Sequence, residues 1–140
     1  MSIRDAKESD VLFLKRLLLQ LGYPDQDEIG IQQKIKHHGQ EGYRLFVAEI
    51  DQEVVGFIAL HWFHLLHSAG NLGRISAFCV DERFRSQGIG IRLLETAEGL
   101  LKLKGCGKIE VTSNPKRTRT HHFYLKQGYT EDSKRFVKYV

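Results

Sequence analysis

Apolar residues recur at every third or fourth position in four stretches of the chain, which is the spacing of a helix with one face turned to a core. In the first stretch these positions are Val11, Leu14, Leu18 and Leu21. A glycine stands at the end of each stretch, and glycine commonly ends a helix because it adopts the left-handed conformation without strain. The pattern predicts helices over residues 8–21, 27–38, 89–105 and 119–127.

Short runs rich in β-branched and aromatic residues lie around these helices. Two of them are separated only by Asp51 and Gln52, so they form a hairpin. The runs predict strands over residues 2–5, 43–50, 53–62, 75–80, 108–112, 129–130 and 135–139, with a polar loop over 68–73. Hairpins followed by a strand–helix–strand–helix succession indicate an α+β fold, in which a mixed sheet carries helices on its faces.

Composition limits the kind of protein that this chain forms. It has 140 residues, 41% hydrophobic and 27% charged, which is typical of one globular domain over residues 1–140. No apolar run approaches the roughly 20 residues of a membrane span, and the first residues lack a signal-peptide core. The two cysteines, Cys79 and Cys106, provide no disulfide framework. We therefore expect a cytoplasmic protein without a membrane partner, in which Cys79 is a small buried side chain.

The net charge is +4, and residues 111–130 contain no Asp or Glu. Such a basic segment suits a phosphorylated cofactor, an anionic substrate, nucleic acid or plain solvent exposure. Nucleic acid is the least favoured of these interpretations, because no aromatic RNA-binding signature or zinc finger accompanies the charge. The cations of the segment are Lys116, Arg117, Arg119 and Lys126.

A glycine-bearing turn joins the predicted strand over residues 75–80 to the helix that follows it. Its sequence is Arg85-Ser86-Gln87-Gly88-Ile89-Gly90. Glycine lets a ligand approach the backbone closely, and the first-turn N–H groups of a helix lack intrahelical partners. Together with the positive end of the helix dipole and the cation of Arg85, these donors suit a diphosphate.

The pattern R-x-x-G-x-G resembles the acyl-CoA signature of the GNAT superfamily of N-acetyltransferases. A second match is Asn114 followed by F-Y-x-x-x-G-Y at residues 123–129, which resembles the closing motif of the same family. The resemblance covers nearly the whole chain. It implies the GNAT fold, a mixed and mostly antiparallel sheet with a central parallel strand pair and flanking helices. It also implies an acyltransferase that uses acetyl-CoA as its co-substrate, and dimerisation is common in the family.

The resemblance implies a role for each matching residue. The backbone of Phe78, Cys79 and Val80 would pair with the pantetheine arm like an added strand, with Asn114 beside it. The turn would hold the diphosphate through Arg85, Ser86, Gln87, Gly88, Ile89, Gly90 and Ile91. Tyr124 would protonate the departing thiolate as general acid. Its alternative is a buried core tyrosine, and Phe123 and Tyr129 are expected to be core residues.

The base that deprotonates the acceptor amine has no clear candidate. Many relatives place a carboxylate on the strand before the turn, but Arg74 and Ala77 stand there, and residues 54–80 contain no acid. A histidine is a suitable base near neutral pH, and a water relay would need no side chain. The remaining side-chain candidates are His61, His64, His67 and Glu49. The three histidines also have the spacing of metal ligands, yet no local acid or cysteine completes a site, so we assign no metal residue.

Two segments, residues 56–67 and 112–135, are similar to aminoalkylphosphonate N-acetyltransferases, some of which use a divalent metal. The resemblance implies a small, anionic primary amine as acceptor. Amino sugars, polyamines and protein or peptide amines are the alternatives. A non-catalytic acyl-CoA-binding module is the alternative of another class, because the expected carboxylates are missing.

Overall fold

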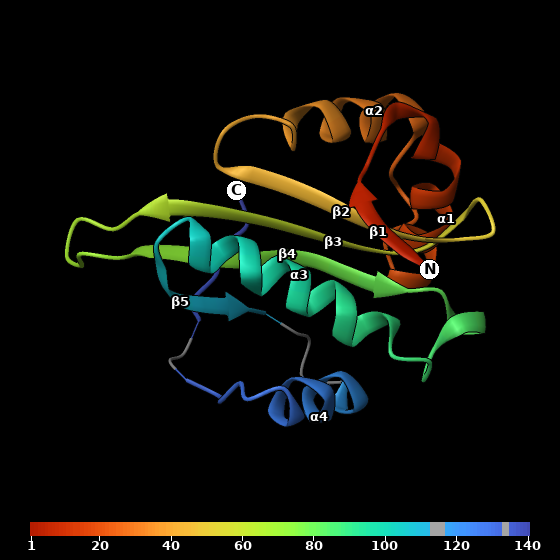
Figure 1. The fold of residues 1–140 in the computed structure, drawn as a ribbon. Helices are drawn as coiled ribbons and strands as arrows, with labels where there is room; N and C mark the ends of the chain where they lie inside the picture. Colours follow the sequence, from red (N-terminus) through yellow and green to blue (C-terminus); the bar gives the residue numbers. More distant parts are fainter. Residues whose placement is uncertain (113–116, 133–134) are drawn as a thin grey trace.

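The computed structural model describes residues 1–112, 117–132 and 135–140 (Figure 1). Four helices follow the predicted ranges within a few residues, and the first is preceded by a 3₁₀ turn over Glu8–Asp10. The helices are α1 (Val11–Leu21), α2 (Glu28–His37), α3 (Ile89–Leu103) and α4 (Thr118–Lys126). The strands are β1 (Ser2–Asp5), β2 (Tyr43–Ile50), β3 (Glu53–His64), β4 (Asn71–Val80) and β5 (Cys106–Val111).

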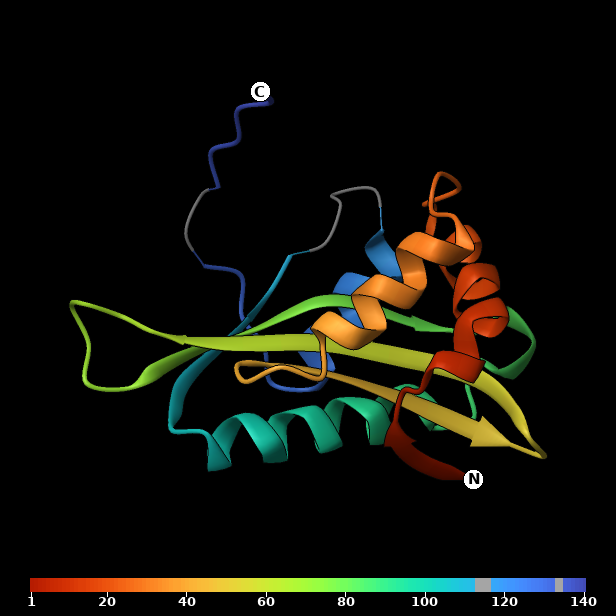
Figure 2. The ribbon, with the colours of Figure 1, turned by 90° about the horizontal axis from the view of Figure 1, so that it is seen from above.

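The strands form one sheet in the order β1-β2-β3-β4-β5, in which β4 and β5 are parallel and the other pairs are antiparallel. Helices α1 and α2 cover one face and α3 covers the other (Figures 1 and 2). This arrangement confirms the predicted α+β class and the parallel strand pair, which lies at one edge of the described sheet and not at its centre.

Each face of the sheet has its own apolar core, because neighbouring residues of a strand point to opposite faces. Toward α1 and α2 the sheet turns Leu45, Val47, Phe57, Ala59 and Cys79. Toward α3 it turns Phe46, Ile58, Leu60 and Ile75. Cys79 is only 6% exposed, as expected of a small buried side chain.

In the described part of the chain, none of the helices is both long and apolar enough to cross a lipid bilayer.

Two details of the strand prediction were wrong. β3 continues past the predicted end at residue 62 to His64, and residues 71–73 of the predicted polar loop belong to β4, because the two strands pair from His61↔Arg74 to His64↔Asn71. Cross-strand pairing thus outweighs the polar composition of residues 71–73. The two final strands are absent: the described residues of 129–132 and 135–140 have no strand conformation. Phe136 and Tyr139 are 90% and 94% exposed, so their β-propensity is not supported by burial against a sheet.

The parallel pair comes apart halfway along β4. Its register runs from Asn71↔Cys106 to Ile75↔Val111 and ends there, whereas β4 continues to Val80. Residues 76–80 therefore have β3 on one side and, among the residues that the structure describes, no strand partner on the other. We call this side of residues 76–80 the open edge.

Gly56 on β3 provides a test of how tightly the sheet packs beside the open edge. A Cβ added there would lie 3.1 Å from the Cys79 carbonyl oxygen and 3.1 Å from Leu93 Cδ1. We expect Gly56→Ala to lower the free energy of unfolding by about 1–3 kcal/mol in urea denaturation, because the added methyl overpacks the contact with α3. Gly99→Ala is the control: among the described residues no atom lies within 4 Å of its added Cβ. Inside α3 that change should raise stability by about 0.8 kcal/mol. Equal stability of both variants would contradict the packing.

Candidate active site

The predicted turn lies between β4 and α3 with the expected geometry. Ser86 and Gly88 both have left-handed backbones, with φ of 63° and 80°. Gly88 is the N-cap residue of α3, and no side-chain hydrogen bond caps the helix among the described residues. Its first-turn N–H groups are therefore available to an anion.

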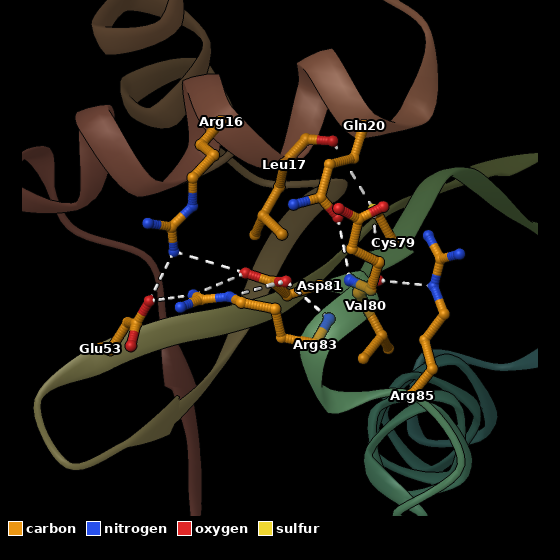
Figure 3. Close-up of polar contacts among 10 residues, drawn as sticks. Arg16, Leu17, Gln20, Glu53, Cys79, Val80, Asp81, Arg83 and Arg85 are labelled. Carbon is orange, nitrogen blue, oxygen red and sulfur yellow. Dashed lines mark hydrogen bonds and ion pairs between the residues drawn. The ribbon is translucent and has the colours of Figure 1, made fainter.

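A buried carboxylate holds the start of this turn in place (Figure 3). Asp81 follows β4 directly, is 0% exposed, and accepts hydrogen bonds from the Arg83 backbone and side chain at 3.0 Å each. Arg16 of α1 lies 3.4 Å from the same carboxylate and also pairs with Glu53, as Arg83 does. The hydrogen bonds to Arg83 lower the pKa of Asp81 to about 2. The network ties the turn to α1 and to the start of β3.

Asp81→Asn tests this network through its dependence on pH. Because the folded-state pKa of Asp81 lies below its ordinary value, the ion pairs stabilise the fold at neutral pH and are lost as pH falls from about 4 to 2. We expect the variant to lose about 2 kcal/mol of unfolding free energy at pH 7 and much less near pH 2. Urea unfolding at both pH values measures this. Asp5→Asn is the control, since Asp5 is more than half exposed and its pair with Arg44 should contribute under about 1 kcal/mol. An equal loss of unfolding free energy in both variants would contradict a stabilising role of the buried Asp81 network.

The open edge presents backbone groups in an alternating pattern. The Asp81 N–H donates to the Val55 carbonyl of β3 at 2.8 Å. The direction of the backbone N–H and C=O groups alternates along a strand. The backbone groups of Cys79 therefore point toward β3, as those of Asp81 do, and the backbone groups of Phe78 and Val80 point toward the open edge. Arg85 already uses this edge, since its Nε donates to the Val80 carbonyl at 3.2 Å.

Tyr124 lies beside the open edge. It projects from α4, is 9% exposed, and its ring centroid is 6.4 Å from that of Phe78. Burial raises the pKa of Tyr124 to about 12, so the hydroxyl keeps its proton at neutral pH. Phe123 and Tyr129 pack against the core on the α3 side, as expected. Asn114 and Lys116 lie outside the described residues.

Two arginines connect the start of α4 to the neighbouring elements. Arg119 Nη2 donates to Ser86 Oγ at 3.3 Å, which places a cation at the turn. Arg117 donates instead to the Leu21 carbonyl at the end of α1. Arg119 is therefore better placed than Arg117 to meet a phosphate at the turn.

A cavity of about 320 Å³ opens between α1, α2 and the sheet, and we call it the acceptor cavity. It reaches Ser76 and Ala77 at the start of the open edge. Its wall is otherwise apolar except for Tyr23, Gln26, Lys34 and His38. None of the described residues that line it is Asp or Glu.

The four side chains proposed as base from the sequence all lie outside this cavity. Glu49 is paired with Arg4 at 2.8 Å, and His64 and His67 are exposed at the β3–β4 turn, at the opposite end of β4 from Val80. His61 packs between Tyr43 and Phe63, with its Nε2 buried and without a hydrogen-bond partner among the described atoms. Burial and the nearby Arg74 lower the pKa of His61.

Arg74 of β4 stands where relatives place a carboxylate, and it contacts an acid on the neighbouring strand β5. Arg74 Nε donates to Glu110 Oε1 at 2.7 Å, so this acid is held by an ion pair. Within the described ranges, no three His, Cys, Asp or Glu side chains gather closely enough to hold a metal ion.

Sequence reasoning missed His38, the one histidine in the acceptor cavity among the described residues. A signal for it was present. Ile31, Ile35 and His38 are spaced at i, i+4 and i+7, so they share one face of α2. Since Ile31 and Ile35 are buried, that face predicts an inward-pointing His38.

Comparison with known proteins agrees with this geometry. The model of the acetyltransferase (GNAT) family matches residues 12–129. Aminoalkylphosphonate N-acetyltransferase of Salmonella typhimurium is 41% identical over 86 residues, which are 61% of this chain and 56% of that protein. The match thus spans little more than half of that relative. An uncharacterized N-acetyltransferase of Chlorobaculum tepidum is 26% identical over 134 residues, covering 96% of this chain and 78% of that protein.

Among solved structures, a transcriptional regulator from Bacillus halodurans superposes with a TM-score of 0.90 at 22% identity, covering 99% of both chains. Glucosamine-6-phosphate N-acetyltransferase from Arabidopsis thaliana superposes with a TM-score of 0.84 at 22% identity, covering 99% of this chain and 97% of that one. At such identity the likeness concerns the fold alone.

Proposed function

The chain belongs to the acetyltransferase (GNAT) family, and on that premise we propose that it transfers an acetyl group from acetyl-CoA to the primary amine of a small substrate of the aminoalkylphosphonate type. The observation that carries the substrate class is the 41% identity to the Salmonella aminoalkylphosphonate N-acetyltransferase.

The chemistry of the acceptor cavity supports an anionic substrate. Lys34 supplies a cation, Tyr23, Gln26 and Ser76 supply hydrogen-bond donors, and the described lining has no carboxylate that would repel a phosphonate. The same donors suit a phosphorylated amino sugar, whereas a polyamine would find no counter-charge among them.

The site also fits acetyl-CoA on three independent observations. No side chain of the described residues caps the first turn of α3, the open edge presents Phe78 and Val80, and the buried side chain of Tyr124 lies beside that edge. Bound acetyl-CoA would supply the acetyl group as a thioester. The N–H groups of residues 88–91 would bind its diphosphate, Phe78 and Val80 would align its extended arm, and Tyr124 would hold the proton for the departing sulfur.

Release of the CoA thiol from acetyl-CoA tests the proposal. The acceptors are 2-aminoethylphosphonate, its carboxylate analogue β-alanine, glucosamine 6-phosphate, spermidine and a short peptide, each with a divalent metal and with a chelator. We expect 2-aminoethylphosphonate to give the highest kcat/KM. Preference for spermidine or the peptide would overturn the substrate class and leave the family assignment intact.

A further inference from the structure

His38 lies where the acceptor cavity and a second cavity meet. It follows α2 as its C-cap residue, is half-buried, and lines the acceptor cavity together with Ser76 and Ala77 of β4. It also lines a second cavity of about 390 Å³ on the other side, toward Tyr43 and Trp62. Its ring is therefore reachable from a cavity that extends to the open edge.

One hydrogen bond fixes which nitrogen of His38 carries the proton. Nδ1 lies 2.8 Å from the Lys34 carbonyl oxygen. Because a carbonyl only accepts, Nδ1 must be the N–H donor, and in the neutral ring Nε2 then holds the free lone pair. This is the tautomer that a proton acceptor requires.

The surroundings of His38 favour its neutral form. Burial lowers its pKa, the hydrogen bond to the Lys34 carbonyl opposes this in part, and the charges of His37 and Lys34 lower the pKa again. From the sheet, the ring centroid of Tyr43 on β2 lies 5.7 Å from that of His38. The charge of His38 in turn lowers the pKa of His61 on β3. The second cavity also carries Asp5, Glu41, Arg44 and Lys104. The ring is thus largely unprotonated at neutral pH.

We propose that His38 is the catalytic base that takes the first proton from the ammonium group of the acceptor; this inference rests on the acetyl transfer proposed above. The N–H bond of the ammonium breaks and Nε2 gains the proton. The freed lone pair then forms the C–N bond to the acetyl carbon as the C–S bond breaks. Tyr124 gives its proton to the leaving sulfur and regains one from the nitrogen, and His38 releases its own proton to solvent through the cavity.

The test compares His38→Asn, His38→Ala and His37→Asn. The side-chain amide of asparagine can stand in for the Nδ1–H group as donor to the Lys34 carbonyl, while Nε2 is lost together with the rest of the ring. At pH 7 we expect His38→Asn and His38→Ala to lower kcat/KM tenfold or more. His37 is exposed and is absent from the described lining of both cavities, so His37→Asn should stay within twofold.

The pH profile separates a base from a structural residue. Wild-type kcat/KM should be level between the pKa of His38 and that of the amine, because the base deprotonates the ammonium. His38→Asn must use amine that is already neutral, so its kcat/KM should rise about tenfold per pH unit and approach wild type near the amine pKa. A deficit of constant size at all pH values, or none, would overturn the role of His38 even where acetyl transfer is established.

A second readout does not depend on any acceptor. Nitrogen-15 spectra of the histidine rings in the folded protein should show Nδ1 protonated in His38, with a pKa below 6.5. Protonation at Nε2 in the neutral ring would overturn the proposal. If this tautomer is found but no amine of the panel reacts, the proposed substrate class fails, whereas an amine that reacts equally well with His38→Asn and wild type overturns the role of His38 alone.

Discussion

Tyr124→Phe is expected to lower kcat by roughly 10²- to 10³-fold, which is within the range for the loss of a general acid. The side chain is buried beside the open edge, and the raised pKa of its hydroxyl keeps the proton that a departing thiolate needs. Because the ring stays in place, affinity for acetyl-CoA and unfolding free energy should change little. Steady-state rates of thiol release, with binding measured by calorimetry, check both parts.

Tyr129→Phe is the matched control for this prediction. Tyr129 packs against Tyr124 and also has a partly buried hydroxyl, but that hydroxyl donates to Glu98 of α3 at 2.8 Å and is thus engaged within the fold. We expect that change to cost stability by about 1 kcal/mol while kcat stays within a few fold. Equal kcat values for wild type and Tyr124→Phe would remove Tyr124 from the chemistry.

Gly88→Asp is expected to weaken acetyl-CoA binding at least 100-fold without unfolding the protein. Position 88 has a left-handed backbone that Asp and Asn tolerate better than most residues, and no described atom lies within 4 Å of an added Cβ. A carboxylate there would stand at the start of α3, where the helix dipole favours it. It would also face the diphosphate at close range, and such repulsion costs about 2–4 kcal/mol near a protein surface.

Gly88→Asn separates charge from shape. It has nearly the same size and backbone preference as Asp, but it leaves the turn neutral. We therefore expect its dissociation constant for acetyl-CoA to rise less than tenfold, while its melting temperature matches that of Gly88→Asp. If both variants bind acetyl-CoA as wild type does, the diphosphate is not held by this turn.

The sequence correctly predicted the elements whose structure is set by residues adjacent in the chain. The turn at residues 85–90, the helix after it and the hairpin around Asp51 each depend on a few adjacent residues, and all three are present. The two final strands failed because β-branched and aromatic residues form a strand only with a partner, and Phe136 and Tyr139 have no burial against the sheet.

The candidate base shows a different limit of sequence reasoning. His61, His64 and His67 are close together in the chain, but strand alternation turns His61 and His64 to opposite faces of β3, and His67 lies beyond the strand in the β3–β4 turn. His38 stands alone in the sequence beside the exposed His37. Only the packing of α2 over the sheet brings it to the same cavity as Ser76 and Ala77, which lie about forty positions further along the chain.

The separation of β4 from β5 after Ile75 has a consequence for the behaviour of the protein in solution. A sheet edge with unsatisfied N–H and C=O groups is a template on which a strand of another molecule can add, and proteins protect such edges to avoid aggregation. Arg85 already covers part of this edge through its bond to the Val80 carbonyl, and acetyl-CoA bound as proposed would cover more of it. Saturation with acetyl-CoA at 100 times its dissociation constant would add about 2.7 kcal/mol to the native state and at the same time cover this template. Under the proposed function, solubility and catalysis would both depend on the same five residues of β4.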